Sequence, residues 1–153
     1  MSERTLALTG ATGFVGATLL KAALASGYKV RALTRRPQPA IAGVDWVEGA
    51  LDRPESLALL MQGADAVVHV AGVVNAPNPS GFERGNIQGT QAIVDAAQSA
   101  GIARFVHVSS LAAREPSLSV YGWSKAEAER VVAASGLDSV SYTHLTLPTK
   151  RIV

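Results

Sequence analysis

The 153 residues of the chain suffice for one domain with a substantial core, and 48% hydrophobic with 17% charged residues is typical of a globular protein. The 14 lysines and arginines exceed the 12 aspartates and glutamates by two, an excess that Lys150 and Arg151 account for, so the charge indicates no nucleic-acid partner. The lack of cysteine excludes disulfides and thiolate metal sites, and the three histidines show no metal-ligand spacing. We therefore expect no metal.

The N-terminus passes directly from Met-Ser-Glu-Arg into an apolar run, without the pattern of a signal peptide. No apolar run approaches the roughly 20 residues that span a bilayer. We expect a cytoplasmic protein with no membrane partner.

Short apolar runs alternate with longer segments of helical period, a pattern typical of β-α-β units and a parallel sheet. The predicted strands are 5–9, 29–34, 44–48, 66–71 and 104–108, the helices are 14–26, one from Pro54, 87–100 and 121–135, and the longer loops are 37–43, 74–85 and 109–119. The run 66–71 has almost no polar residue except His69, which predicts a strand buried on both faces. The fold class is α/β, a doubly wound parallel sheet with helices on both faces.

The segment from Ser139 differs from the rest of the chain. A sixth strand is due after Gly136, but polar residues stand where a central strand would be apolar, although the Thr, Tyr and Leu content allows an edge strand. The segment also resembles the translation of a sequencing-library adapter. We predict a domain of residues 1–138 and a non-native or disordered tail of residues 139–153.

Gly10, Gly13 and Gly16 form a Gly-x-x-Gly-x-x-Gly pattern between the first strand and the first helix. Gly10 permits a tight exit from the strand, Gly13 lets backbone N–H groups approach a pyrophosphate, and Gly16 lets the helix pack closely on the sheet. The N–H groups and positive dipole end of the helix then face the phosphates. A glycine turn without a ligand is the alternative, but the place of the motif in the first β-α-β unit favours dinucleotide binding.

Five segments in order resemble motifs of the extended and atypical short-chain dehydrogenases/reductases. They are Thr9-Gly10-Ala11-Thr12-Gly13-Phe14-Val15-Gly16, His69-Val70-Ala71-Gly72, Asn86-Ile87-Gln88-Gly89-Thr90, Val108-Ser109-Ser110 and Tyr121-Gly122-Trp123-Ser124-Lys125. The resemblance covers about residues 4–138. It implies a Rossmann-like NAD(P)-binding domain of the NAD-dependent epimerase/dehydratase type, truncated so that the C-terminal substrate domain is missing. The cofactor contacts that it implies include Gly10, Thr12, Gly13, Phe14, Val15, Gly16, Ala71 and Gly72.

Thr34-Arg35-Arg36 ends the second predicted strand, where Rossmann-type sites carry an acidic residue for NAD or an arginine for the 2′-phosphate of NADP. Arg35 and Arg36 therefore favour NADP(H) over NAD(H), the alternative being a solvated basic pair. Gly49-Ala50-Leu51-Asp52 resembles the family segment beside the adenine, with Ala50 in place of the usual carboxylate. Leu51 and Asp52 are candidate adenine contacts, unless Asp52 caps the next helix.

Tyr121 and Lys125 stand four residues apart on a predicted helix, so their side chains share one face. A tyrosine, with an ordinary pKa near 10, is a poor base at neutral pH, and a nearby ammonium favours its phenolate. By resemblance Tyr121 is the catalytic acid or base, Lys125 also holds the nicotinamide ribose, and Ser110 binds the substrate oxygen, with Ser109 as the substitute. The alternatives are a surface aromatic and a solvated lysine. His69 and His107 are expected to be strand residues with satisfied nitrogens.

The resemblance implies an NAD(P)-dependent oxidoreductase or epimerase/dehydratase that transfers hydride to or from a hydroxyl or ketone carbon of a sugar nucleotide or other small molecule. Members of the atypical branch give the alternative of a non-catalytic NADP(H)-binding sensor or structural subunit. The presence of Tyr121 and Lys125 favours the enzyme. The alternative for the truncated chain itself is that it is inactive. A homodimer is expected by family analogy alone.

Overall fold

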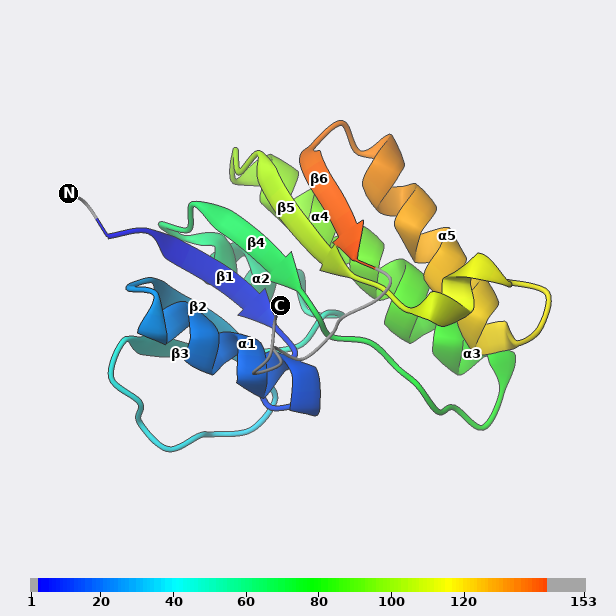
Figure 1. The fold of residues 1–153 in the computed structure, drawn as a ribbon. Coiled ribbons are helices and arrows are strands. Elements are labelled where there is room, and N and C mark those ends of the chain that lie inside the picture. Colours follow the sequence, from blue (N-terminus) through cyan, green and yellow to red (C-terminus); the bar gives the residue numbers. More distant parts are fainter. Residues whose placement is uncertain (1–2, 143–153) are drawn as a thin grey trace, which may run out of the picture.

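The computed structural model describes residues 3–142 of the chain. These residues form a parallel sheet of six strands in the order β3-β2-β1-β4-β5-β6 (Figure 1). The strands are β1 (Thr5–Thr9), β2 (Lys29–Thr34), β3 (Val44–Glu48), β4 (Ala66–His69), β5 (Arg104–Val108) and β6 (Asp138–Tyr142). This strand order is that of the Rossmann fold, which confirms the predicted fold class.

Helices cover both faces of the sheet, but unequally. Of the longer helices within residues 3–142, α1 (Phe14–Ala25) lies in front of the sheet in Figure 1, whereas α2 (Pro54–Met61), α4 (Gly89–Ser99) and α5 (Val120–Ala134) lie behind it. The alternation of side chains along each strand separates two cores. Ala7 of β1 contributes to the core behind the sheet, and Leu8 contributes to the core beneath α1.

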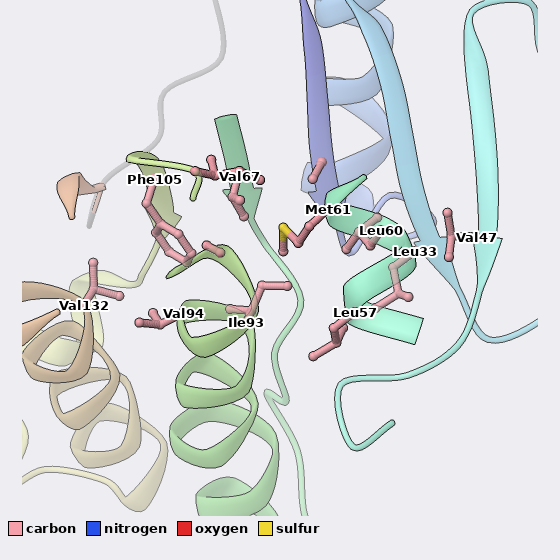
Figure 2. Close-up of a cluster of buried hydrophobic side chains, with 13 residues drawn as sticks. Leu33, Val47, Leu57, Leu60, Met61, Val67, Ile93, Val94, Phe105 and Val132 are labelled. Carbon is pink, nitrogen blue, oxygen red and sulfur yellow. The ribbon is translucent and has the colours of Figure 1, made fainter. Parts of the chain in front are cut away.

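The larger core joins the sheet to the three helices behind it (Figure 2). Its members are almost fully buried and include Leu33, Val47, Leu57, Leu60, Met61, Val67, Ile93, Val94, Phe105 and Val132. Phe105 of β5 is the largest of the fully buried side chains. The burial of this apolar face explains why the helical periods in the sequence predict α2, α4 and α5 well.

Strand β4 is shorter than predicted, because it ends at His69 rather than at Ala71. The N–H groups of Val70 and Ala71 both donate to the side-chain hydroxyl of Thr9, the last residue of β1, at 3.0 and 3.1 Å. Ala66, Val67 and His69 are buried and Val68 is half-buried, so the prediction of burial on both faces holds for all of β4 except Val68. An apolar sequence here reflects one covered face and one partly open face.

The open face belongs to a cavity of about 680 Å³ between α1 and the strands. Leu8, Leu19 and Val30 line it from β1, α1 and β2, and Val68 and Val106 line it from β4 and β5. Arg4, Asp65 and Arg104 also border this cavity. None of the residues predicted to bind the cofactor or the substrate borders it.

The predicted loop 74–85 contains helical structure. A short helix α3 (Pro79–Phe82) leads into a π-helical segment, η1 (Glu83–Gln88), which runs directly into α4. Gly85 belongs to this segment, and a Cβ there would stand 2.2 Å from Cγ2 of Val73. The close approach of Val73 therefore favours glycine. The loop 109–119 likewise contains a 3₁₀ turn, η2 (Leu111–Arg114).

Strand β6 (Asp138–Tyr142) pairs with β5 in parallel at the edge of the sheet. Its exposed and half-buried residues alternate, which is the edge-strand alternative that the sequence left open. Residues 143–153 lie outside the described part of the chain. The proposal that the tail is non-native therefore stays a prediction.

Within residues 3–142, no helix is both long enough and apolar enough to cross a membrane. The same residues contain no group of three or more His, Asp or Glu side chains arranged to hold a metal ion.

Candidate dinucleotide site

The predicted site segments meet at one edge of the sheet. Each follows a strand, and all the strands are parallel, so Gly10, Arg35, Leu51, Ala71 and Ser109 lie beyond the carboxyl ends of β1 to β5 (Figure 1). The order of the strands reverses between β1 and β4, which are neighbours in the sheet. Ligands of open α/β sheets bind in the crevice at such a point.

Two glycines of the phosphate loop are required by packing. Gly10 has φ +77°, and a Cβ there would lie 2.7 Å from the amide nitrogen of Ala71. A Cβ at Gly16 would lie 1.7 Å from the carbonyl oxygen of Gly10. Gly10 thus allows the loop to touch the end of β4, and Gly16 allows α1 to begin against the loop, as predicted from the sequence.

Gly13 differs from these two, because packing within the chain does not require a glycine there. A Cβ added at Gly13 would have the carbonyl oxygen of Gly10 as its nearest neighbour, at 3.5 Å, which is an ordinary contact distance. Helix α1 begins directly after Gly13 with no side-chain cap and no acidic residue in its first turn. Free N–H groups and open space at a helix N-terminus fit a diphosphate.

The other predicted loop residues differ in exposure. Thr12 and Phe14 are exposed, and the Phe14 ring is 80% accessible. Val15 is half-buried and lines a cavity at the end of β4 and β5.

Arg35 and Arg36 follow β2 and are exposed. The Thr34 hydroxyl shapes this turn, because it donates to the carbonyl oxygen of Arg36 at 2.6 Å and accepts from the amide of Arg36 at 3.3 Å. Among residues 3–142, neither guanidinium forms a salt bridge with a carboxylate. Both are therefore accessible to an anionic ligand.

Leu51 packs against the larger core and lies beside Gly89. A Cβ added at Gly89 would lie 2.8 Å from Cδ1 of Leu51. Asp52 is exposed and does not cap α2, so that alternative was wrong. The turn is closed instead by the Ser56 hydroxyl, which donates to the carbonyl oxygens of Arg53 at 2.7 Å and Ala50 at 3.1 Å.

A cavity of about 160 Å³ brings together two of the candidate catalytic residues, Tyr121 and Lys125. Gly72, Ser109, Tyr121 and Lys125 line it. The remaining lining residues are Asn86 and the five valines Val15, Val70, Val73, Val74 and Val108. This small, largely apolar space is of the kind in which a few polar groups orient a reacting ligand.

Ser110 does not line this cavity. Its Oγ accepts a hydrogen bond from the amide of Ala112 at 3.2 Å and so caps η2. Ser109, the substitute considered from the sequence, borders the cavity together with Tyr121.

Lys125 is not a solvated surface lysine, because its side chain is 5% exposed and its Nζ donates to the carbonyl oxygen of Val108 at 3.2 Å. Burial lowers the pKa of Lys125 from 10.5 to about 8, although the Glu129 carboxylate opposes this shift. Tyr121 is half-buried, and its ring lies 6.2 Å from that of Phe82. Both residues therefore face the cavity from α5 rather than the solvent, against the alternatives raised for them.

Asn86 is a structural member of the site that the sequence reasoning did not single out. It is 1% exposed, and its carboxamide accepts from the Val73 amide at 2.7 Å and donates to the Val73 carbonyl at 2.9 Å. The same carboxamide donates to the Ser124 hydroxyl at 2.9 Å. Asn86 thus ties the segment after β4 to α5, and its place at the start of the Asn-x-x-Gly-Thr segment was the available signal.

The two histidines lie side by side beneath Lys125, with ring centroids 5.8 Å apart and planes inclined by 15°. His69 contacts Thr9 through Nδ1 and Thr90 through Nε2, as expected for satisfied nitrogens. His107 contacts Ser141 through Nδ1, but its buried Nε2 has no partner among residues 3–142, so the expectation was wrong for His107. Within the described residues this nitrogen is a buried polar atom without a hydrogen bond.

Burial lowers the pKa of both histidines, and the positive charge of Lys125 adds to the effect. The pKa of His107 falls to about 3, and that of His69, which His107 also lowers, falls well below its usual 6.5. Both rings are therefore neutral at physiological pH.

Acidification is expected to destabilise the fold. Because the two histidine pKa values are lower in the folded chain, the unfolded chain binds more protons below pH 6.5, and the free energy of unfolding falls as pH falls. Each histidine contributes a slope that rises toward about 1.4 kcal/mol per pH unit as the pH falls below 6.5. Urea unfolding between about pH 7 and about pH 5.5, above most carboxyl titrations, measures it. A His107→Leu variant should lose about half of the slope; a slope unchanged by the substitution would contradict the assignment.

A Rossmann sheet with an open glycine loop at β1 and a buried lysine beside a tyrosine defines a dinucleotide-binding domain of the short-chain dehydrogenase/reductase type. The chain belongs to the family described as NAD(P)H-binding, which matches residues 10–149. This match extends past Asp138, the predicted end of the domain.

Curated relatives resemble the chain over much of its length. The ceramide reductase of Caulobacter vibrioides is 46% identical over 85% of the chain and 42% of its own length. A 4-hydroxy-2-methyl-3-oxo-4-farnesyl-3,4-dihydroquinoline-1-oxide ketoreductase of Stigmatella aurantiaca is 35% identical over 82% of the chain and 44% of its own length. The chain therefore spans less than half the length of these relatives.

Among solved structures, the dTDP-glucose 4,6-dehydratase DesIV of Streptomyces venezuelae, a double mutant with NAD bound, is 29% identical with a TM-score of 0.78. The match covers 90% of the chain and 54% of DesIV. WbmH of Bordetella bronchiseptica in complex with NAD⁺ has a TM-score of 0.81 at 23% identity, over 93% of the chain and 56% of WbmH, and shows the shared fold. Reductases, dehydrogenases and a dehydratase are thus among the relatives, and the family is one of oxidoreductases, epimerases and dehydratases.

Proposed function

We propose that the chain is the cofactor-binding half of an NADP(H)-dependent oxidoreductase that interconverts a ketone and a hydroxyl on an apolar small molecule. The observation that carries this proposal is the cavity at the ends of β4 and β5, where Tyr121 and the buried Lys125 meet a wall of valines. The family membership supplies the cofactor class, and the cavity supplies the chemistry beside it.

When bound, the nicotinamide cofactor supplies or accepts the hydride. In the reductive direction, the Tyr121 hydroxyl donates a proton to the carbonyl oxygen that becomes the alkoxide. Because the pKa of Lys125 is about 8, its ammonium group is mostly charged at neutral pH and stabilises the phenolate that remains on Tyr121. The Ser109 hydroxyl donates a hydrogen bond to the same substrate oxygen, or Ser110 does so if it leaves its contact with Ala112.

The apolar substrate class has two supports. The two relatives described above are named for a ceramide and for a farnesyl quinoline oxide, and another is a putative dihydroflavonol 4-reductase of Synechocystis, 42% identical over 69% of the chain. Val74, which lines the cavity, is 66% exposed, and Leu118, just before α5, is 79% exposed. Sugar-nucleotide chemistry and epimerisation or dehydration are the other outcomes of the test below, because solved neighbours bind UDP-sugars.

The second candidate function is NADP(H) binding without turnover, as a sensor or structural subunit. The photosystem II assembly factor Ycf39 of Cyanophora paradoxa, 29% identical over 84% of the chain, favours it. The pair formed by Tyr121 and Lys125 favours the enzyme. Cytoplasmic location and a homodimer remain predictions of this proposal, and the molecular mass in solution tests the latter.

A substrate screen tests the proposed function. A protein that extends this chain to the length of its relatives is incubated with NADPH and with ketones of three kinds: long-chain, polycyclic and sugar-nucleotide. We expect equal amounts of NADP⁺ and alcohol with an apolar ketone. Tight NADPH binding with no turnover on any ketone would instead support the sensor, and turnover with the sugar nucleotide alone would overturn the substrate class.

The cofactor preference is tested by replacing Arg35 and Arg36 together with alanine. In the unaltered chain, fluorescence titration should show NADPH bound about tenfold or more tightly than NADH, since each charge-assisted contact to the 2′-phosphate contributes about 1.5 kcal/mol or more. The double variant should bind NADH as before and lose the preference. Equal affinity for both nucleotides in the unaltered chain would contradict the preference for NADP(H), but the assignment of the fold would stand.

A further inference from the structure

We propose that His69 is a positioning residue of the dinucleotide site, which holds the phosphate loop against the end of β4 through one fixed tautomer. The inference rests on NAD(P) binding at the proposed site, not on turnover. It starts from hydrogen bonds that join three elements at one point: β1, β4 and α4.

The hydroxyl of Thr9 has no free bonding capacity. It accepts from the amides of Val70 at 3.0 Å and Ala71 at 3.1 Å, which occupy both of its lone pairs. Its own proton points to the remaining contact, Nδ1 of His69 at 2.7 Å. Nδ1 must therefore be an acceptor, because a proton on it would meet an oxygen with no lone pair left.

The tautomer of His69 follows from this count. A neutral imidazole that lacks a proton on Nδ1 carries one on Nε2, which then donates to the Thr90 hydroxyl at 3.1 Å. The ring is 1% exposed, and both of its nitrogens have hydrogen-bond partners within the chain. Burial and the charge of Lys125 keep the pKa of His69 low and so favour this neutral form.

The bonded group lies where the phosphate loop meets the segment after β4. Thr9 directly precedes Gly10, whose Cα approaches the amide of Ala71 so closely that a Cβ would lie 2.7 Å from it. The Thr9 hydroxyl clamps the same amide from the strand side. His69 fixes the direction of that hydroxyl, so it sets how the phosphate loop and the segment Ala71–Gly72 stand relative to each other.

A purely structural histidine would behave differently from a positioning one. His69 also packs beside His107 and lies 6.3 Å from the ring of Phe105, so any replacement lowers stability. If His69 positions the loop, the affinity for the cofactor depends on whether a replacement side chain supplies the acceptor of Nδ1 or the donor of Nε2.

Two replacements separate these roles. Asparagine places a carbonyl oxygen near the position of Nδ1 and keeps the acceptor for Thr9, whereas glutamine keeps a donor near Nε2 for Thr90 and lacks the acceptor. In the chain as it stands, at a temperature where each variant is folded, we expect His69→Asn to bind NADPH within about threefold of the unaltered chain. His69→Gln should weaken binding about tenfold, the usual effect of one buried hydrogen bond left unmade. Equal affinities of the two folded variants would overturn the proposal.

The tautomer is tested without any substitution. Long-range ¹H–¹⁵N spectra of the imidazole in the unaltered chain distinguish a protonated from an unprotonated ring nitrogen. We expect His69 to show protonated Nε2 and unprotonated Nδ1, with and without NADPH. A protonated Nδ1 would overturn the proposal even if both variants failed to fold. Because neither readout uses catalysis, failure of the proposed oxidoreductase function would leave both interpretable.

Discussion

A Gly16→Ala variant should lose both its stability and its affinity for NAD(P)(H). The added Cβ would lie 1.7 Å from the carbonyl oxygen of Gly10 and 3.0 Å from Cα of Ala11, and both are backbone atoms that cannot rotate away. Helix α1 would have to move off the end of β1. We expect the free energy of unfolding to fall by about 3 kcal/mol or more, the range of severe overpacking. Urea unfolding measures this loss, and NADPH titration measures the affinity.

Gly13→Ala is the matched control for this prediction, because it adds the same methyl group to the same loop. The Cβ would make only an ordinary 3.5 Å contact, and φ −83° at Gly13 suits alanine. Stability should change by at most about 1 kcal/mol, the cost of alanine at a helix N-cap. NADPH affinity should nevertheless fall about tenfold or more, because the methyl group takes the space of the diphosphate. Unchanged affinity in Gly13→Ala would place the phosphates elsewhere.

A Tyr121→Phe variant should bind NADPH normally and lose turnover. Removing the hydroxyl leaves the ring packed beside Phe82 and removes the proton donor, so we expect kcat to fall by about 10² to 10⁴-fold. Affinity for NADPH should stay within about threefold. The measurement is steady-state reduction of the ketone found in the screen, in the protein extended to the length of its relatives. Turnover within a few-fold of the unaltered enzyme would remove Tyr121 from the chemistry.

Serine variants accompany this measurement. Ser109 lines the cavity with Tyr121, whereas Ser110 caps η2. We expect Ser109→Ala to lower kcat and Ser110→Ala to act mainly on stability. The reverse result would mean that the η2 turn rearranges when substrate binds, and would restore the assignment implied by the family resemblance.

The elements that could be predicted are those whose apolar period matches a covered face. Strand β1 and helix α5 agree with the sequence within a residue, because each is an apolar or helix-favouring run that ends at a glycine or a loop. The glycine loop could also be predicted, since Gly10 and Gly16 are explained by backbone contacts that only glycine permits.

Other features depend on contacts between distant segments. The end of β4 is set by the Thr9 hydroxyl, and the π-helical start of α4 by Val73 and the carboxamide of Asn86. The buried Nε2 of His107 has no partner within residues 3–142. Thr9 is 61 residues from Val70, and Val73 is 13 residues from Asn86, so hydrophobic period and local propensity do not predict these contacts.

The most direct test is amide hydrogen exchange with and without NADPH. It tests whether the carboxyl edge of the sheet forms one dinucleotide site. We expect slower exchange at two places far apart in sequence: the loop of residues 10–16 and the segment 71–73 beside Tyr121 and Lys125. Peptides along the exposed face of β6 (Asp138–Tyr142) should exchange at an unchanged rate and serve as the internal control. Saturable NADPH binding that slows exchange elsewhere, and leaves residues 10–16 unchanged, would contradict the account.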